Sequence, residues 1–126
     1  EYAQSYAEAF FQATASVCLV CDRDSIIAAA GASKKETLEK KISDKLDHAI
    51  KQRKTVVSAD TGSPIPLTGD GGAADDSATQ IVAPIIASGD PLGAVIVYMK
   101  DKAAAMGSGK MLAQTGATFL GKLLEE

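Results

Sequence analysis

The sequence predicts an α+β protein in α/β/α layers, an antiparallel sheet with helices on both faces. Residues 84–98 read PIIASGDPLGAVIVY, two apolar runs joined by a short turn, which is typical of an antiparallel hairpin. Neither run alternates with polar residues, since Ala94–Met99 is apolar at every position. Both faces of the hairpin therefore need a cover. Helical patterns at the two ends of the chain and in its middle supply these covers.

The first quarter of the chain predicts a helix followed by a hairpin. Residues 2–13 repeat aromatic side chains and alanines at helical spacing, so one side of this helix is apolar. Residues 16–22 (SVCLVCD) and 25–31 (SIIAAAG) are apolar strands. Arg23-Asp24 between them is a two-residue turn.

The middle of the chain predicts short helices and a long loop. A Lys/Glu-rich helical turn starts at Ser33, and Ser43 caps a second helix. One side of this second helix carries Ile42, Leu46, Ala49, Ile50 and Arg53. A short strand follows at Val56-Val57. Residues 59–77 hold two prolines and four glycines without a period, and a loop of this length is usually functional or mobile.

The end of the chain predicts an apolar helix that is capped by Ser108. Its apolar stripe consists of Leu112, Thr115, Gly116, Phe119, Leu120 and Leu123. Small residues recur four apart on this helix (Ala113, Ala117, Gly121), and on the first helix (Ala3, Ala7). Small residues permit close helix packing, inside the chain or between two copies. We expect the two terminal helices to lie side by side and to form a dimer seam, at which a bulkier residue 117 would overpack a close helix contact.

Composition predicts one domain over residues 1–126 and excludes several classes of protein. The 13 basic and 16 acidic residues give a net charge of −3. The domain as a whole therefore lacks the excess of positive charge that is typical of nucleic-acid-binding domains. No apolar stretch approaches membrane-spanning length and no export leader is visible. Two cysteines in such a chain suit a reducing cytoplasm. Because residue 1 is Glu, we expect either a piece of a longer polypeptide or a processed one.

Cys18 and Cys21 form a C-x-x-C pattern, which elsewhere indicates redox exchange or a zinc site. On a strand, residues three apart point to opposite faces, with Cα atoms about 10 Å apart at roughly 3.3 Å per residue. A disulfide needs Cα atoms within about 7 Å. We therefore predict two reduced cysteines without a catalytic role.

Other motifs are incomplete. GSGK at 107–110 lacks the earlier glycine and the Ser or Thr of a phosphate-binding loop. His48 is the only histidine, so one chain cannot form a His-based triad or a multi-histidine metal site. Asp70, Asp75 and Asp76 do not follow the calcium-loop pattern. No catalytic or metal-binding residue is predicted.

Eight of the 13 basic residues fall within residues 34–54, with four acidic residues among them. Most are expected on a solvated helical face, although an anionic ligand or a nucleic-acid backbone is the alternative. Ser33-Lys34-Lys35 follows a strand end and opens a helix. Backbone N–H groups and an ammonium are expected to meet one anion there.

Three segments carry a resemblance to a known family: CDRDSIIAAAGASKK (21–35), KISDKLDHAIKQRKTVV (41–57) and PIIASGDPLGAVIVYMKD (84–101). The last of these is similar to GAF domains in general. The first resembles the C-terminal domains of the stage V sporulation protein T family, AbrB-related transcription factors. The similarity runs from about residue 1 to residue 124.

This resemblance implies a GAF-like sensor and oligomerisation domain of a cytoplasmic sporulation regulator. It also implies an AbrB-type DNA-binding domain ahead of this chain, and homo-oligomers formed through the terminal helices. By position it makes Ser33, Lys34, Ser58, Pro84 and Ile86 the candidates for binding a small molecule. No N-K-F-D-E motif and no chromophore-anchoring loop cysteine is found, so the ligand and any cofactor stay unknown.

Three hypotheses about function stay open. The first is a small-molecule sensor and oligomerisation domain of a transcription factor. The second is an oligomerisation module whose pocket is filled by side chains such as Leu67 and Ile86. The third is a GAF-fold thiol reductase that acts on methionine sulfoxide, which would need exposed cysteines of low pKa.

Overall fold

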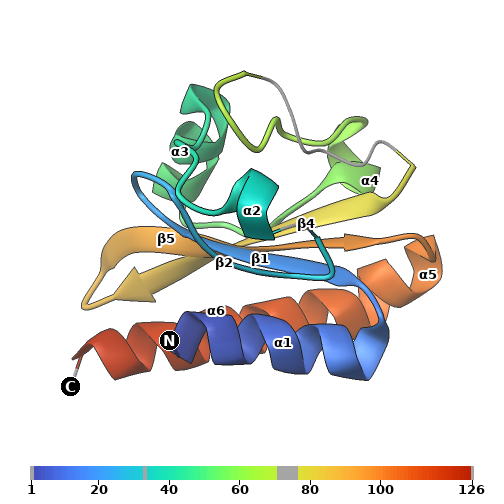
Figure 1. Ribbon diagram of the computed structural model, residues 1–126. Helices are drawn as coiled ribbons and strands as arrows, with labels where there is room; N and C mark the ends of the chain where they lie inside the picture. The colour runs from blue at the N-terminus through green and yellow to red at the C-terminus, as the bar shows by residue number, and fades with distance from the viewer. Residues whose placement is uncertain (1, 33, 71–76, 126) are drawn as a thin grey trace.

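A five-stranded antiparallel sheet lies between two helical layers in the computed structural model, which describes residues 2–32, 34–70 and 77–125 (Figure 1). The strand order is β2-β1-β5-β4-β3. The strands are β1 Val17–Asp22, β2 Ile26–Ala30, β3 Val56–Val57, β4 Thr79–Ala87 and β5 Asp90–Met99. The helices are α1 Tyr2–Thr14, α2 Lys34–Thr37, α3 Asp44–Lys51, α4 Ser58–Thr61, α5 Lys102–Ala104, the π-helical η1 Ala105–Gly109 and α6 Lys110–Glu125. The predicted fold class is confirmed.

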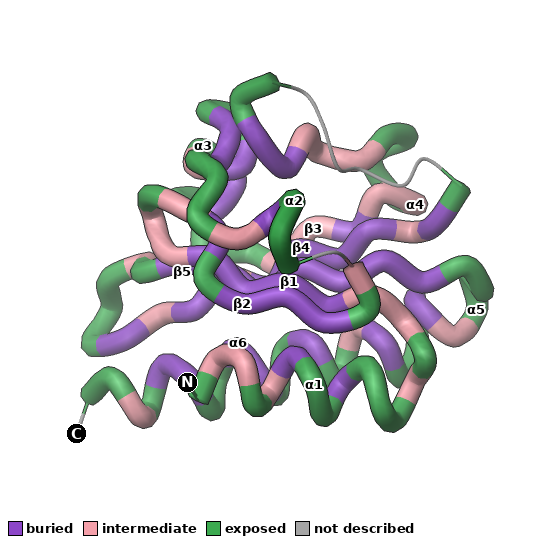
Figure 2. Tube along the Cα trace, in the orientation of Figure 1, coloured by how far each residue is buried: buried purple, intermediate pink, exposed green. Residues whose placement is uncertain are grey.

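Both faces of the sheet are buried, which explains why the central strands do not alternate (Figure 2). One face packs under α1 and α6, and the other packs under α2, α3 and α4, which we call the roof (Figure 1). The strand β5 gives Val95, Val97 and Met99 to the helix side. It gives Ala94, Ile96 and Tyr98 to the roof side. Successive residues of a strand point to opposite faces, so an all-apolar strand lies at the centre of three layers.

The cysteines of β1 behave as predicted. Cys18 belongs to the helix-side core and Cys21 to the roof-side core, and both are free thiols. Burial raises the pKa of each thiol to about 12. A thiol that stays protonated at neutral pH is a poor nucleophile. The prediction of two reduced cysteines on opposite faces is confirmed.

The turn between β1 and β2 is the predicted two-residue turn. The Asp22 backbone N–H donates to the Ser25 carbonyl over 3.0 Å. The Asp22 carboxylate accepts from the backbone N–H groups of Asp24 and Ser25, each at 2.7 Å. Asp22 therefore holds the turn with its side chain as well as its backbone, as aspartate commonly does in turns.

The C-terminal helical segment begins earlier than predicted. Helical structure starts at Lys102, where the Asp101 carboxylate accepts from the Ala104 backbone N–H at 3.0 Å, and it continues through η1 into α6. The prediction of a cap at Ser108 is wrong, because Asp101 supplies the cap well before it. Gly109 lies inside the helical segment, and a Cβ there would come within 2.2 Å of the Met99 sulfur.

The small residues of α6 face the sheet rather than a partner helix. Ala113 and Ala117 are buried in the helix-side core. A Cβ on Gly121 would lie 2.3 Å from the carbonyl oxygen of Ile86 in β4. These residues let α6 approach the strands closely, so the expected helix contact at Ala117 is corrected to a helix–sheet contact. A bulkier residue 117 would strain the fold of one chain.

The terminal helices lie side by side on one face of the sheet, as predicted (Figure 1). The Tyr6 hydroxyl of α1 donates to the Leu112 carbonyl of α6 at 2.5 Å. Gly116 makes room for the same ring, since a Cβ there would be 2.0 Å from the Tyr6 Cζ atom. Burial raises the pKa of the Tyr6 phenol well above its usual range.

The roof follows the prediction at its start and departs from it after α3. The Ser43 hydroxyl caps α3 by accepting from the Leu46 backbone N–H at 3.0 Å. The helix ends at Lys51, so Arg53 does not share its apolar side but stands beyond the end with a φ of 63°. The loop after β3 is not wholly irregular, because α4 forms one helical turn there and Thr68 bridges to Ile42.

Two further findings concern the described residues alone. No helix there combines the length and the apolar character that crossing a bilayer requires. No group of three or more histidine, cysteine, aspartate or glutamate side chains is placed to hold a metal ion within residues 2–32, 34–70 and 77–125.

Candidate functional site

The roof side of the sheet, where the resemblance implies a ligand pocket, holds a packed apolar core. Its members come from the sheet, from α3 and from the loop that follows α4. The largest fully buried members are Leu19, Ile26, Leu46, Ile50, Leu67, Val82 and Ile96. Leu67 is only 1% exposed, so the loop inserts this side chain into the core. One of the two residues named as fillers of a closed pocket therefore lies in the roof-side core.

A buried polar network fixes the loop over the sheet. Gln80 of β4 is 2% exposed, and its Nε2 donates to the Ile65 carbonyl at 2.9 Å and to the Tyr98 hydroxyl at 3.0 Å. Its Oε1 accepts from the Ile65 backbone N–H at 2.8 Å. The Gln80 amide thus pairs with one loop residue as a neighbouring strand would. The sequence reasoning missed this residue, although a glutamine inside an apolar strand was the available signal.

Three of the predicted ligand-binding residues stand on the roof or on β4. The Ser58 hydroxyl, at the start of α4, accepts from the Gln80 backbone N–H at 2.8 Å. Pro84 is half-buried and points toward the roof, because its neighbours Ala83 and Ile85 both lie in the helix-side core. Ile86 is half-buried beyond a bulge between Ile85 and Ile86. Ser33 lies outside the described residues.

Lys34 reaches toward the helical layer. It opens α2, and its ammonium lies 3.5 Å from the Glu8 carboxylate of α1. Glu8 also accepts from Gln4 Nε2 at 2.9 Å, which together with Lys34 lowers the pKa of the Glu8 carboxyl. Gln4 in turn exchanges two hydrogen bonds with the backbone of Ala29 in β2, at 2.9 and 3.0 Å. This chain of contacts connects a roof helix to α1 around the edge of the sheet.

A cleft of about 380 Å³ opens beside the start of α3. It is lined by Lys41, Ile42, Ser43, Asp44, Lys45, Pro66, Thr68 and Gly69. The Ser43 hydroxyl donates to the Pro66 carbonyl at 2.6 Å, so the loop is tied directly to the cap of α3. Among the described residues, none of those predicted for ligand binding lines this cleft. Its lysines belong to the basic segment 34–54, and that composition was the only signal in the sequence.

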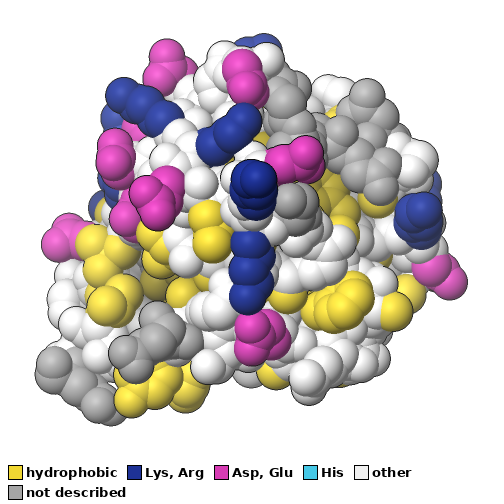
Figure 3. Space-filling view, viewed as in Figure 1, with side chains coloured by type: hydrophobic (Ala, Val, Ile, Leu, Met, Phe, Trp, Pro, Cys, Tyr) yellow, Lys and Arg dark blue, Asp and Glu magenta, His cyan; other side chains and the backbone are white. Residues whose placement is uncertain are grey.

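The outer face of the helical layer is apolar and open. We call this surface the helical face, and define it by the exposed large hydrophobic residues Tyr2, Phe11, Met106, Met111, Leu112, Phe119 and Leu124, of which Phe11 stands at its edge against Gly31. Among the described residues, the other exposed large hydrophobic side chains are those of Ile27 and Leu92, which stand on β2 and β5. Figure 3 shows hydrophobic side chains gathered where α1 begins and α6 ends. An apolar cavity of about 220 Å³ lies there between the two helices and the sheet.

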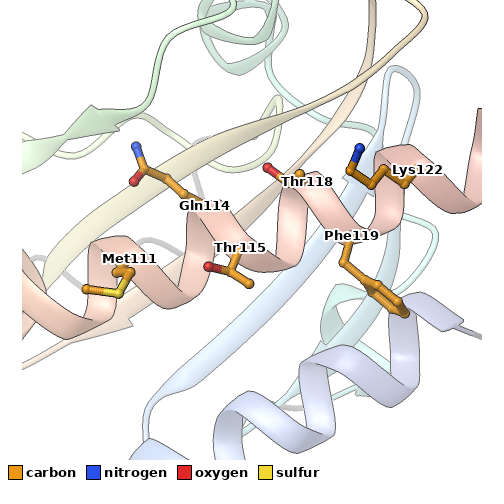
Figure 4. A pocket seen from close by; sticks show the side chains of 6 residues that line it. All are labelled: Met111, Gln114, Thr115, Thr118, Phe119 and Lys122. Carbon is orange, nitrogen blue, oxygen red and sulfur yellow. The ribbon is translucent and has the colours of Figure 1, made fainter.

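A shallow groove of about 430 Å³ follows α6 on this face (Figure 4). Met111, Thr115 and Phe119 project from one side of the helix, and Phe119 points toward α1. Gln114, Thr118 and Lys122 project from the other side. The sequence reasoning placed Leu112 and Phe119 on the buried stripe, but both are exposed, and small residues take their place against the sheet.

The fold defines a GAF-type domain, and solved structures support this. The chain superposes on "the cofactor binding GAF domain of the nutrient sensor CodY" from Clostridium difficile with a TM-score of 0.65 and 17% identity, over 96% of this chain and 83% of that chain. It superposes on a type II free methionine-R-sulfoxide reductase from Thermoplasma acidophilum with a TM-score of 0.67 and 17% identity, over 96% and 88%. At this identity the likeness shows the fold alone.

The chain belongs to the stage V sporulation protein T C-terminal family of transcription factors. The model of that family, "Stage V sporulation protein T C-terminal, transcription factor", matches residues 1–125. The chain is also 36% identical to Stage V sporulation protein T of Bacillus subtilis (strain 168), over all of this chain and 68% of that protein. The resemblance that three segments carried is confirmed.

Proposed function

We propose that this chain is the regulatory domain of a sporulation transcription factor. In this proposal it senses a small molecule on its roof side and assembles into a dimer or higher homo-oligomer through its helical face. DNA is bound by an AbrB-type domain outside this chain. This part of the proposal is supported by the Bacillus subtilis relative, because the chain covers 68% of its length. A transcription factor works where the chromosome lies, so we assign the protein to the bacterial cytoplasm.

The helical face is the observation that carries the assembly proposal. Seven of the nine exposed large hydrophobic side chains among the described residues stand on the terminal helices and on the short segment that joins β5 to α6. Single exposed apolar side chains are ordinary, but their concentration on one layer of the fold is typical of an interaction surface. Met111 is the most exposed of them, at 65%.

A second copy fits this surface because two adjacent helices with an apolar outer side can pair with the same two helices of another chain. Such pairing produces a four-helix arrangement around a two-fold axis. The inner sides of both helices are already occupied by the sheet, as the burial of Ala7 and Ala117 shows. Only the outer side is left for a partner.

The sensing part of the proposal rests on the roof. Lys34, Ser58, Pro84 and Ile86, with Ser33, are the candidates that the family resemblance gives for contacts with a small molecule. The cleft beside α3 adds Lys41 and Lys45, whose ammonium groups suit an anionic group on the ligand.

An oligomerisation module with a filled pocket is the second candidate. The burial of Leu67 in the roof-side core favours it, because this side chain takes up space that a ligand would need. Under this alternative the helical face keeps its role and the roof has a purely structural one.

A reductase function is opposed by the cysteines. A thiol reductase needs an accessible thiol of low pKa. Cys18 and Cys21 are buried in separate cores, and burial raises the pKa of both. We propose that the domain has no enzymatic activity.

Sedimentation equilibrium at tens of micromolar tests the proposal. The wild-type domain is expected to be a dimer or larger, and Met111→Glu is expected to sediment as a monomer with an unchanged unfolding transition. Leu92→Glu is the matched control, because Leu92 is also an exposed large hydrophobic side chain but stands on β5. A monomeric wild type, or a Met111→Glu variant that still assembles, would refute the assembly.

A further inference from the structure

The turn between β4 and β5 receives hydrogen bonds from both sides of the sheet. Ser88 and Gly89 form its two central residues, with φ of 51° and 83°, and Ala87 pairs with Asp90 across it. Positive φ at both central residues is the conformation of the tightest hairpin turns. Such a turn has little freedom of its own, so a force on its backbone is passed to the strands that it joins.

The roof holds this turn through two arginines. Arg53 Nε donates to the Gly89 carbonyl at 3.1 Å, and the Arg53 backbone N–H donates to the Ile50 carbonyl of α3 at 3.1 Å. Arg53 is thus fixed to the end of α3 by its backbone and to the turn by its side chain.

Arg23 repeats this arrangement a short way along the hairpin. Its Nη1 donates to the Pro91 carbonyl at 3.3 Å, and its Nε contacts the Asp47 carboxylate of α3 at 2.5 Å. The Arg23 guanidinium lowers the pKa of the Asp47 carboxyl, so the pair is charged at neutral pH. The carbonyls of Gly89 in the turn and of Pro91 just after it are therefore both attached to α3.

The helical layer holds the turn from the other face. The Ser88 backbone N–H donates to the Glu125 carboxylate at the end of α6 over 2.8 Å. One helical turn earlier, Gly121 lies against the Ile86 backbone so closely that a Cβ would be 2.3 Å from the carbonyl oxygen. The end of α6 is thus attached to the same few residues of the hairpin as α3.

We infer that the β4–β5 turn couples α3 to the end of α6, two helices on opposite faces of the sheet (Figure 1). A displacement of α3 pulls on the Gly89 and Pro91 carbonyls, and the turn conveys it to Ser88 and so to Glu125. The coupling is a property of one folded chain and holds whether or not the chain assembles. Through this turn, a displacement of α3 in the roof can reach the C-terminal part of the helical face without passing through the packed core.

Hydrogen–deuterium exchange of the purified domain tests this coupling. Arg53→Met keeps the aliphatic stem and removes the guanidinium, and Lys54→Met is the control on the neighbouring exposed residue. In Arg53→Met we expect the amides of residues 119–125 to exchange about three- to tenfold faster, as the net loss of one ordinary, solvent-exposed hydrogen bond would cause. In Lys54→Met they exchange at the wild-type rate, and α1 is unchanged in both variants.

The reverse direction must agree, because coupling between two sites is reciprocal. Glu125→Ala is expected to speed exchange in residues 49–53, whereas Lys122→Ala, one turn away on α6, leaves them unchanged. If Arg53→Met does not fold, Arg53→Lys removes the same Nε donor and keeps the charge. Faster exchange confined to residues 50–54 and 88–91, an equal increase over the whole chain, or no change at all would each overturn the inference.

Discussion

Gly121→Ala tests whether the small residues of α6 serve the fold of one chain rather than the contact between chains. Alanine in a helix is favoured over glycine by roughly 0.5–1 kcal/mol, so propensity alone predicts a gain in stability. The structure predicts a loss, because the new Cβ would stand 2.3 Å from the Ile86 carbonyl oxygen, whereas real Cβ contacts lie beyond 3.0 Å. Helix and strand must separate by at least the difference, 0.7 Å.

The size of the loss follows from these opposing effects. Overpacking of a well-filled interface costs about 1–3 kcal/mol, and the carbonyl belongs to a paired strand that cannot turn aside. After subtraction of the helix propensity, we expect the free energy of unfolding to fall by about 0.5–2 kcal/mol. For a domain of this size that lowers Tm by roughly 2–8 °C.

Urea and thermal unfolding of Gly121→Ala and Gly107→Ala measure this. Gly107 is the matched control, since a Cβ there meets nothing within 4 Å. Gly107→Ala is expected to be as stable as the wild type or more stable. A Gly121→Ala variant with the stability of Gly107→Ala would show that α6 does not sit on β4 as described.

Three further predictions concern the core, the thiols and DNA. Gln80→Ala leaves both backbone groups of Ile65 without their partner and opens a void. We therefore expect the free energy of unfolding, measured by urea titration, to fall by about 2–4 kcal/mol. A decrease below about 1 kcal/mol would contradict the network. Because Cys18 and Cys21 have pKa values of about 12 in the folded state against 9.0 ordinarily, the unfolded chain loses these protons first, and stability should fall as pH rises above 9. Replacing both cysteines by alanine should reduce this loss of stability with rising pH. An unchanged pH dependence of the free energy of unfolding would contradict the assignment to the two thiols. With a net charge of −3, the isolated domain should not bind duplex DNA with sub-micromolar Kd at physiological salt in anisotropy titrations; such binding would overturn the assignment of DNA contact to another domain.

The layered fold could be predicted from the sequence because a strand that is buried on both faces has apolar residues at successive positions, without alternating polar ones. In a chain of this length, an apolar residue at every position of Ala94–Met99 is expected only where both faces of the strand are covered. The positions of Cys18 and Cys21 followed from the same period of two. Local rules also sufficed for the Ser43 cap and the turn at Arg23-Asp24, since both depend on residues within a few positions of each other.

What the sequence could not predict depends on contacts between distant segments. Ser108 and Asp101 are both residue types that cap helices, and the structure uses the earlier one, with Gly109 inside the helical segment and packed against Met99. The helix at the end of the chain has apolar residues on more than one side, so the sequence alone did not determine which side is buried. The sheet selected the one with glycines and alanines, which left Phe119 exposed.

The candidate site shows the same limit. Family resemblance supplied Ser58 and Pro84 on the roof side, but the contact of Lys34 with Glu8 crosses 26 positions and no pattern foretold it. The Gln80 network likewise joins residues 15 and 18 positions apart. The role of such a side chain becomes visible only once the loop is placed over the sheet.

Native mass spectrometry of the domain, purified without denaturation at tens of micromolar, tests the central claim most directly, because it reports assembly and a bound small molecule together. One chain has a mass of 13.0 kDa. We predict a species of two chains or an even multiple of them that carries a small molecule of defined mass, which is released on unfolding. A dimer without any bound molecule would support the filled-pocket alternative, and a species of 13.0 kDa alone would contradict the account of a regulatory domain that assembles through its helical face.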